Sequence, residues 1–346
     1  MSNTSGANGK RPHATMKHVA ALAGVGIKTV SRVINQEPNV APETAARVWD
    51  AVHALDYHVD MQAGSLRRTG GRTQTLGLLV SSVDNPFASA MHRSIEDAAL
   101  ARGVAVFASS LDDDPEREDL AIRAFLRRRV DGLILTTASR NQPYLASTAA
   151  RGIPVVFVDR EPAPGAVDAV MSDNRAGAAE ATAHLVRHGH RRIALLTDRA
   201  GIQTATDRRR GFLDALSLAG IPVAEADIVT ELHDAESAHA AMAQLLARDE
   251  PPTAVFSAQN LVTVGVLHAL RAAGRAHRTA LVGFDDLPLA DLVEPGVTVV
   301  AQDPHEIGRL ASARVFARLE GDAGEAQRIF VPTRLVPRGS GELPPA

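Results

Sequence analysis

The chain has 346 residues, of which 45% are hydrophobic and 22% are charged, and it contains no cysteine. This length predicts two or three folding units, and the composition is typical of globular rather than disordered proteins. No apolar run approaches the roughly 20 residues that cross a membrane, and the lack of cysteine excludes a disulfide framework and a thiolate metal site. A polar start without the apolar stretch of an export signal predicts a cytoplasmic protein.

Charge is distributed unevenly along the chain. The net charge of -3 combines +4 on residues 1–75 with -7 on the rest, and no acidic residue precedes Glu37. A basic segment of this kind favours a polyanion such as nucleic acid as a partner, although a solvated basic tail would have the same charge. The pattern of residues has to separate these two interpretations.

The first 60 residues predict a flexible arm at residues 1–14 and a small helical domain at residues 15–60. The expected helices lie near residues 17–23, 27–34 and 42–55. Gly24-Val25-Gly26 separates the first two helices, and glycine there provides the backbone angles of a tight turn. A tight turn between two short helices is typical of a helix-turn-helix DNA-binding domain.

After a short hinge helix and linker at residues 61–74, the chain alternates apolar runs of strand length with segments of helix length. The runs are TLGLLV, VAVFAS, GLILTT and PVVFV, followed after a restart by RIALLT, DIVT, TAVFS and TALVGF. Continuous apolar runs suit parallel strands that are buried on both faces. Residues 75–346 are therefore expected to form two lobes, each a doubly wound parallel sheet. We expect lobe 1 at about 75–160 and 291–322, and lobe 2 at about 161–290 and 323–340.

The segment MKHVAALAGVGIKTVSRVINQEPNVAPETAARV, residues 16–48, resembles the DNA-binding headpiece of the LacI family of bacterial transcriptional regulators, which includes the lactose and galactose repressors. The resemblance covers nearly the whole chain. It implies an all-α helix-turn-helix headpiece plus an α/β two-lobed domain like that of periplasmic binding proteins. It also implies a repressor that binds a palindromic operator in double-stranded DNA as a homodimer and responds to a small-molecule effector.

The second helix of the headpiece carries the predicted base contacts. Lys28 and Arg32 are suited to donate to guanine, and Ile27 is suited to pack on a thymine methyl in the major groove. The resemblance implies further DNA contacts at Thr29, Ser31, Asn35 and Tyr57. In the hinge it implies that Leu66 wedges into the minor groove, while a plain tether with Leu66 idle is the alternative.

Two positions depart from the family pattern. Gly26 replaces the Ser that usually caps the second helix, and His18 replaces an Asp in the first turn of the first helix. Neither change removes a predicted base contact.

The resemblance also implies an effector cleft between the lobes, at positions that follow predicted strands. These residues are Asp84, Asn85, Phe87, Asp159, Arg160, Arg208, Gln259, Asn260, Asp285 and Gln302. Their donors, acceptors and guanidinium groups suit hydroxyls or a carboxylate, so a sugar or related polyol is the expected effector. Structural ion pairing is the alternative for Arg208 and Asp285, and a structural role is the alternative for Gln259 and Gln302. Asp112-Asp113-Asp114 is interpreted as a loop and a helix cap.

Other functions share part of this pattern. A periplasmic sugar-binding protein has two such lobes, but it needs an export signal and no headpiece. An enzyme is not indicated, because the sequence has no phosphate-binding glycine loop, GxSxG elbow or metal-ligand cluster. We therefore expect no catalytic residue, cofactor, metal or membrane partner. A corepressor-dependent repressor or an activator of the same family stays open, since the sequence does not fix the sign of the coupling.

Overall fold

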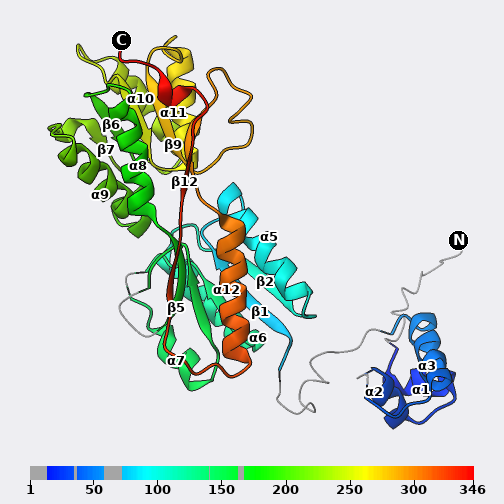
Figure 1. The fold of residues 1–346 in the computed structure, drawn as a ribbon. Coiled ribbons are helices and arrows are strands. Elements are labelled where there is room, and N and C mark those ends of the chain that lie inside the picture. The colour runs from blue at the N-terminus through cyan, green and yellow to red at the C-terminus, as the bar shows by residue number, and fades with distance from the viewer. Residues whose placement is uncertain (1–13, 35–36, 58–71, 140, 163–166) are drawn as a thin grey trace, which may run out of the picture. The chain divides into compact units, whose positions relative to one another are not determined.

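The computed structural model describes residues 14–34, 37–57, 72–139, 141–162 and 167–346. The chain divides into two units, residues 1–73 and residues 74–346 (Figure 1). Asn35, Leu66 and the predicted hinge helix lie outside the described residues, as does the predicted arm apart from Ala14.

The N-terminal unit contains the three helices that the sequence predicts, α1 (Met16–Ala23), α2 (Ile27–Ile34) and α3 (Pro42–Ala54). Val19, Val30 and Val48 come from different helices, and all three are fully buried at the centre of a small core. Because each helix has one apolar face, packing the three together removes all of these faces from water.

The turn between α1 and α2 is fixed by backbone geometry. Gly24 has a φ of +65°, a left-handed conformation that ends α1 and that favours glycine. The carbonyl of Gly26 accepts hydrogen bonds from two backbone N–H groups of α2 at 2.8 and 3.1 Å, and glycine at this position has no side chain that could cap the helix. His18 provides an acceptor where the family pattern has an Asp, because its Nδ1 accepts from the backbone N–H of Thr15 at 3.2 Å.

Residues 74–346 form two lobes, each built on one six-stranded sheet (Figure 1). The strands of lobe 1 are parallel and lie in the order β11-β5-β4-β3-β1-β2. They are β1 (Thr75–Val80), β2 (Ala105–Ser110), β3 (Gly132–Leu135), β4 (Val155–Val158), β5 (Asp168–Ser172) and β11 (Arg328–Val331). The helices of this lobe are α5 (Pro86–Leu100), α6 (Pro115–Arg128), α7 (Tyr144–Ala150) and α12 (Pro304–Leu319).

Lobe 2 repeats this plan with the strand order β12-β10-β9-β8-β6-β7, in which β12 alone runs antiparallel to its neighbour. Its strands are β6 (Ile193–Leu196), β7 (Ile228–Val229), β8 (Ala254–Ser257), β9 (Ala280–Phe284), β10 (Thr298–Ala301) and β12 (Arg334–Val336). Its helices are α8 (Asn174–Arg187), α9 (Gln203–Leu218), α10 (Ala235–Leu246) and α11 (Asn260–Ala272), with short 3-10 helices η1 (Glu225–Asp227) and η2 (Ser340–Glu342). The predicted fold class, a helical headpiece plus a two-lobed α/β domain, is confirmed.

Both faces of each sheet are covered by helices, which explains the continuous apolar runs. Leu76, Leu78 and Val80 of β1 pack with α5 and α12, whereas Leu79 packs with α6 on the opposite face. All four side chains are fully buried. In lobe 2, α8 and α9 contribute to one core cluster and α10 and α11 to the other. In a parallel sheet that is buried on both faces, successive side chains of a strand are all apolar, so apolar and polar residues do not alternate along the sequence.

The expected crossing points between the lobes are wrong. β5 still belongs to lobe 1 and β10 still belongs to lobe 2, so the chain crosses near residues 173, 302–303 and 332–333. The expected crossings lay near residues 160, 290 and 322. Figure 1 shows α12 beside β5 in lobe 1, although α12 follows the strands of lobe 2 in the sequence.

A buried charge at the start of β5 explains why the sequence did not reveal this strand. The carboxylate of Asp168 accepts hydrogen bonds from Arg318 Nε at 2.7 Å and Arg314 Nη2 at 3.1 Å, both on α12. Burial raises the pKa of Asp168, but the hydrogen bonds from Arg318 and from the Gln327 backbone, with the charge of Arg314, outweigh it and lower the pKa. Asp168 therefore looks like a loop residue in the sequence and acts as an ionic anchor for α12 in the fold.

Within the described ranges, no helix combines the length and apolarity that a membrane span requires.

Candidate DNA-binding helix and interlobe cavity

The exposed face of α2 carries most of the residues predicted to contact DNA. Ile27, Lys28 and Arg32 are exposed, and Thr29 and Ser31 of the same helix are half-buried. Because the two buried valines of α2 face the core, its opposite face is available to a partner. A short helix with two cations and an exposed isoleucine on one face has the donors and the apolar surface that base edges in a major groove require.

Arg32 has a partner that the sequence analysis did not assign. Its Nε lies 3.4 Å from Glu37 Oε2, and the two side chains are 55% and 47% exposed. Ion pairs at this exposure contribute little to stability. If Arg32 donates to a guanine, as the sequence predicts, the nearby carboxylate of Glu37 competes with the base for the guanidinium.

Of the other residues predicted to contact DNA, the structure describes only Tyr57. Tyr57 is half-buried and packs against the core of the N-terminal unit, so its ring also supports the fold. The predicted roles of Asn35 and Leu66 concern residues outside the described ranges.

A polar cavity of about 380 Å³ lies between the two lobes of residues 74–346. Nine of the ten residues predicted for the effector cleft line it, namely Asp84, Asn85, Phe87, Asp159, Arg160, Arg208, Gln259, Asp285 and Gln302. Most of them follow the carboxyl ends of strands, where the loops of parallel sheets in the two lobes face each other.

Arg208 forms part of the wall contributed by lobe 2. It is 5% exposed, its Nε donates to Asn174 Oδ1 at 2.8 Å, and its Nη1 donates to the Ala258 carbonyl at 2.8 Å. The guanidinium stacks 3.9 Å from the centre of the Phe284 ring. Burial lowers the pKa of Arg208, and the nearby carboxylates of Asp285 and Asp159 oppose that effect. These contacts fix the plane of the guanidinium at the cavity wall.

Two aspartates occupy equivalent positions in the two lobes. Asp159 follows β4 with a φ of +67°, and Asp285 follows β9 with a φ of +73°. Aspartate tolerates this left-handed conformation better than most residues, and such conformations concentrate at binding sites. Gln302 Nε2 donates to Asp285 Oδ1. Burial raises the pKa of Asp159, and the charges of Arg160 and Arg208 partly offset it. The raised pKa of Asp159 favours its protonated form, which can donate a hydrogen bond as well as accept one, so the two aspartates together offer both donors and acceptors to hydroxyl groups.

Asn260 does not line the cavity, so its predicted role as an effector contact is not supported. It is 1% exposed, and its side-chain amide exchanges two hydrogen bonds with Asn85, at 3.0 and 3.2 Å. Asn85 precedes α5 in lobe 1 as its cap, and Asn260 begins α11 in lobe 2. The pair therefore joins the two lobes at one wall of the cavity.

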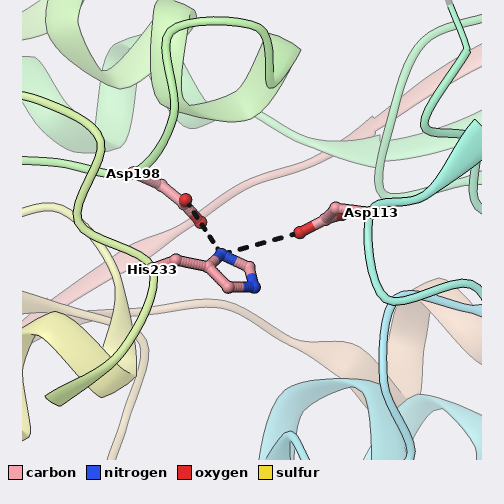
Figure 2. Close-up of side chains that lie close together, drawn as sticks. All are labelled: Asp113, Asp198 and His233. Atoms are coloured by element: carbon pink, nitrogen blue, oxygen red, sulfur yellow. Dashed lines mark hydrogen bonds and ion pairs between the residues drawn. The ribbon is translucent and has the colours of Figure 1, made fainter.

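Sequence reasoning missed several residues that line the cavity, and three of them form a cluster of titratable side chains. Asp113 lies in the loop after β2, Asp198 lies after β6, and His233 lies before α10 (Figure 2). Asp114 does cap α6, as predicted, by accepting from the Glu116 backbone at 2.8 Å. Asp113, however, points to the cavity rather than serving as a plain loop residue. No sequence signal joins it to His233, because the two lie far apart in the chain.

Asp113, Asp198 and His233 bring their ligand atoms within 4.8 Å of one another, which is a donor set that a metal ion could use. A positive charge is already present there, because Arg160 Nη2 lies 2.5 Å from Asp113 Oδ1. The guanidinium neutralises one carboxylate of the set, and this weakens the argument for a cation.

A helix-turn-helix unit joined to a two-lobed domain with a polar cavity defines a DNA-binding regulator that carries a solute-binding domain. Residues 15–60 match the family model described as bacterial regulatory proteins, lacI family. Residues 73–338 match the model described as periplasmic binding proteins and sugar binding domain of LacI family. The chain belongs to the LacI family of bacterial regulatory proteins.

Relatives and solved structures agree with this membership. The ribose operon repressor of Escherichia coli K12 is 32% identical over 94% of this chain and 99% of its own. The structure of the lac repressor dimer bound to operator and the anti-inducer ONPF is 27% identical, covers 95% of this chain and 99% of that one, and has a TM-score of 0.85. The complex of the transcriptional regulator CelR with cellobiose is 32% identical, covers 95% of this chain and 100% of that one, and has a TM-score of 0.70. Proteins of this family bind operator DNA and small-molecule effectors, and the matched relatives are regulators rather than enzymes.

Proposed function

We propose that this protein represses transcription by binding a palindromic operator as a homodimer through α2, and that a neutral sugar or related polyol in the interlobe cavity changes this binding. The observation that carries the proposal is the cavity itself. Polar side chains from both lobes line it, so a ligand that contacts both lobes stabilises one lobe arrangement over others.

The charges that line the cavity favour a neutral ligand over an anionic one. Seven of the lining residues are aspartates, against two arginines and one histidine. One of the arginines, Arg160, is already paired with Asp113. A carboxylate or phosphate would meet an excess of negative charge, whereas hydroxyl groups can donate to the aspartates and accept from Arg208. The structural likeness to CelR, which was solved in complex with cellobiose, supports the same ligand class.

The dimer and the palindrome are proposed together. A single α2 reads only a few base pairs, and a two-fold dimer reads two half-sites. The lac repressor, which was solved as a dimer bound to its operator, supports this arrangement. Leu289 and Leu292, 66% and 74% exposed on lobe 2, are apolar side chains that a second copy could cover.

The experiment starts from an operator selected out of random duplexes by the full-length protein. Fluorescence anisotropy then measures affinity for this operator and for a scrambled duplex, with and without D-ribose, cellobiose and D-ribose 5-phosphate. We expect a palindromic preference that a neutral sugar changes and the phosphate does not. A lower affinity with sugar identifies an inducer, and a higher affinity identifies a corepressor. Equal affinity for operator and scrambled duplex under every condition would reject the proposal.

A further inference from the structure

We infer that His233 is a proton-controlled latch between the two lobes, which holds the cavity closed when its ring is protonated and weakens that closure when it is neutral. A latch of this kind acts whether or not the cavity holds a ligand. It would make the response to any effector depend on pH.

The geometry joins residues from opposite lobes. Figure 2 shows the His233 ring between the two carboxylates, with Asp198 on its own lobe and Asp113 on the other. His233 Nδ1 lies 3.2 Å from Asp198 Oδ1 and 3.8 Å from Asp113 Oδ2. The Asp113 side chain is 8% exposed and the His233 side chain 37% exposed, so solvent only partly screens this contact.

The charged groups around His233 favour its protonated form. The hydrogen bond to Asp198 is the main cause that raises the pKa of His233, and the charges of Asp198 and Asp113 raise it further. Burial and the charge of Arg199 act in the opposite direction but do not prevail. Asp234 is the next residue in the chain and adds another carboxylate. The ring therefore carries a proton to a higher pH than an isolated histidine does.

The two carboxylates are held by different lobes, which turns a local ion pair into a contact between lobes. Arg160 fixes Asp113 to lobe 1, since its Nη2 lies 2.5 Å from Asp113 and its Nη1 donates to the Thr137 carbonyl at 3.1 Å. Asp198 accepts from the Arg199 backbone at 2.7 Å within lobe 2. Opening the lobes separates His233 from Asp113 but leaves the pair with Asp198 in place.

Two other described hydrogen-bonded contacts between the lobes involve only groups that do not titrate, whereas Asp159 of lobe 1, whose pKa burial raises, faces Arg208 and Asp285 of lobe 2. The Asn85–Asn260 pair consists of amides, and the Glu161 backbone N–H donates to the Gln203 amide oxygen at 3.0 Å. His233 gains a partner in the closed state, so closure should be favoured below its pKa and lost as pH rises through that value. Full water screening at the 3.8 Å separation sets the lower limit, so the equilibrium between closed and open lobes should change at least about fivefold.

The test uses the full chain, in which the lack of native cysteine allows two unique labels. Arg123→Cys lies on α6, the lobe 1 helix that follows Asp113, and Ala240→Cys lies on α10, the lobe 2 helix that follows His233. Energy transfer between dyes on these two positions is measured from pH 5.5 to 8.5 without ligand, in protein diluted with unlabelled copies. We expect the closed fraction to fall with rising pH.

Matched variants separate the latch from other effects of pH. His233→Gln and Asp113→Asn should both remove the pH response, and Asp113→Asn does so while leaving the pair of His233 with Asp198. His239→Gln, a histidine on α10 away from the cavity lining, should respond like the wild type. His233→Lys should stay closed across the range, which covers the case in which the Gln variant folds poorly. Circular dichroism checks the folding of each variant.

Two results would overturn the latch. The first is a pH response of unchanged size in both His233→Gln and Asp113→Asn. The second is a response that disappears with EDTA and returns with Zn²⁺, because the three residues would then hold a metal ion rather than a proton. Neither result bears on whether the protein binds its operator, so failure of the latch and failure of the proposed function can be distinguished.

Discussion

Replacing Arg208 by lysine tests the chemistry of the interlobe cavity most directly. Lysine keeps the charge but loses the planar group that reaches Asn174 and Ala258 at 2.8 Å each. Arg208 uses two different nitrogens, Nε and Nη1, for these acceptors, whereas the three donors of lysine all radiate from one nitrogen and do not span the same positions. A charge-assisted hydrogen bond to a ligand contributes about 1.5–3 kcal/mol, so we expect sugar affinity to fall roughly 10- to 150-fold.

The same substitution also has a structural effect, which must be measured separately. Leaving one buried acceptor unsatisfied costs about 1–3 kcal/mol in the free energy of unfolding. Urea unfolding determines this loss, and calorimetric titration at a temperature well below the transition determines affinity for the sugar that gives a response in the operator assay. Arg209→Lys changes the exposed neighbour of Arg208 and serves as the matched control.

A sugar affinity within twofold of the wild type in Arg208→Lys would exclude a direct contact between Arg208 and the sugar. An equal loss of sugar affinity in Arg209→Lys and Arg208→Lys would exclude it as well. Affinity for operator DNA without sugar should be the same in both variants, because α2 belongs to the other unit of the chain.

The remaining predictions concern DNA binding and stability. Arg32→Ala should weaken operator binding by about 1–3 kcal/mol in anisotropy titrations and affect scrambled duplex less, and equal losses on both would exclude base reading. Glu37→Gln releases Arg32 from its ion pair and should raise operator affinity at low salt, and an unchanged or lower affinity would contradict this role for the pair. Leu66→Ala should reduce both DNA bending and affinity, and an unchanged bend angle in a gel-shift assay would reject the wedge. Asp168→Asn should lower the free energy of unfolding by about 3 kcal/mol at pH 7, because it leaves Arg318 without its buried carboxylate. Since the pKa of Asp168 is lowered in the folded state, its contribution is present above its unfolded pKa of about 3.9 and is lost as pH falls below it, so urea midpoints of variant and wild type should converge in acid.

Sequence periodicity was sufficient to predict the helices of the headpiece and most strands of the two lobes. The bounds of α2 agree with the prediction, and those of α1 and α3 differ from it by one residue, because each helix has its own apolar face and its own turn signals. The nine cavity residues were also predictable, since loops that follow parallel strands gather at one edge of a sheet and the resemblance supplied the positions.

Only the tertiary structure showed which lobe contains β5, β10 and β11 and which polar side chains contact one another. Asp168 looks like a loop residue until Arg314 and Arg318 of α12 surround it. Asn260 forms hydrogen bonds with Asn85 of the opposite lobe, and His233 lies near the carboxylate of Asp113 of the opposite lobe. Local patterns encode backbone periodicity and turns, but the pairing of charges and amides depends on distances that exist only after distant segments have packed.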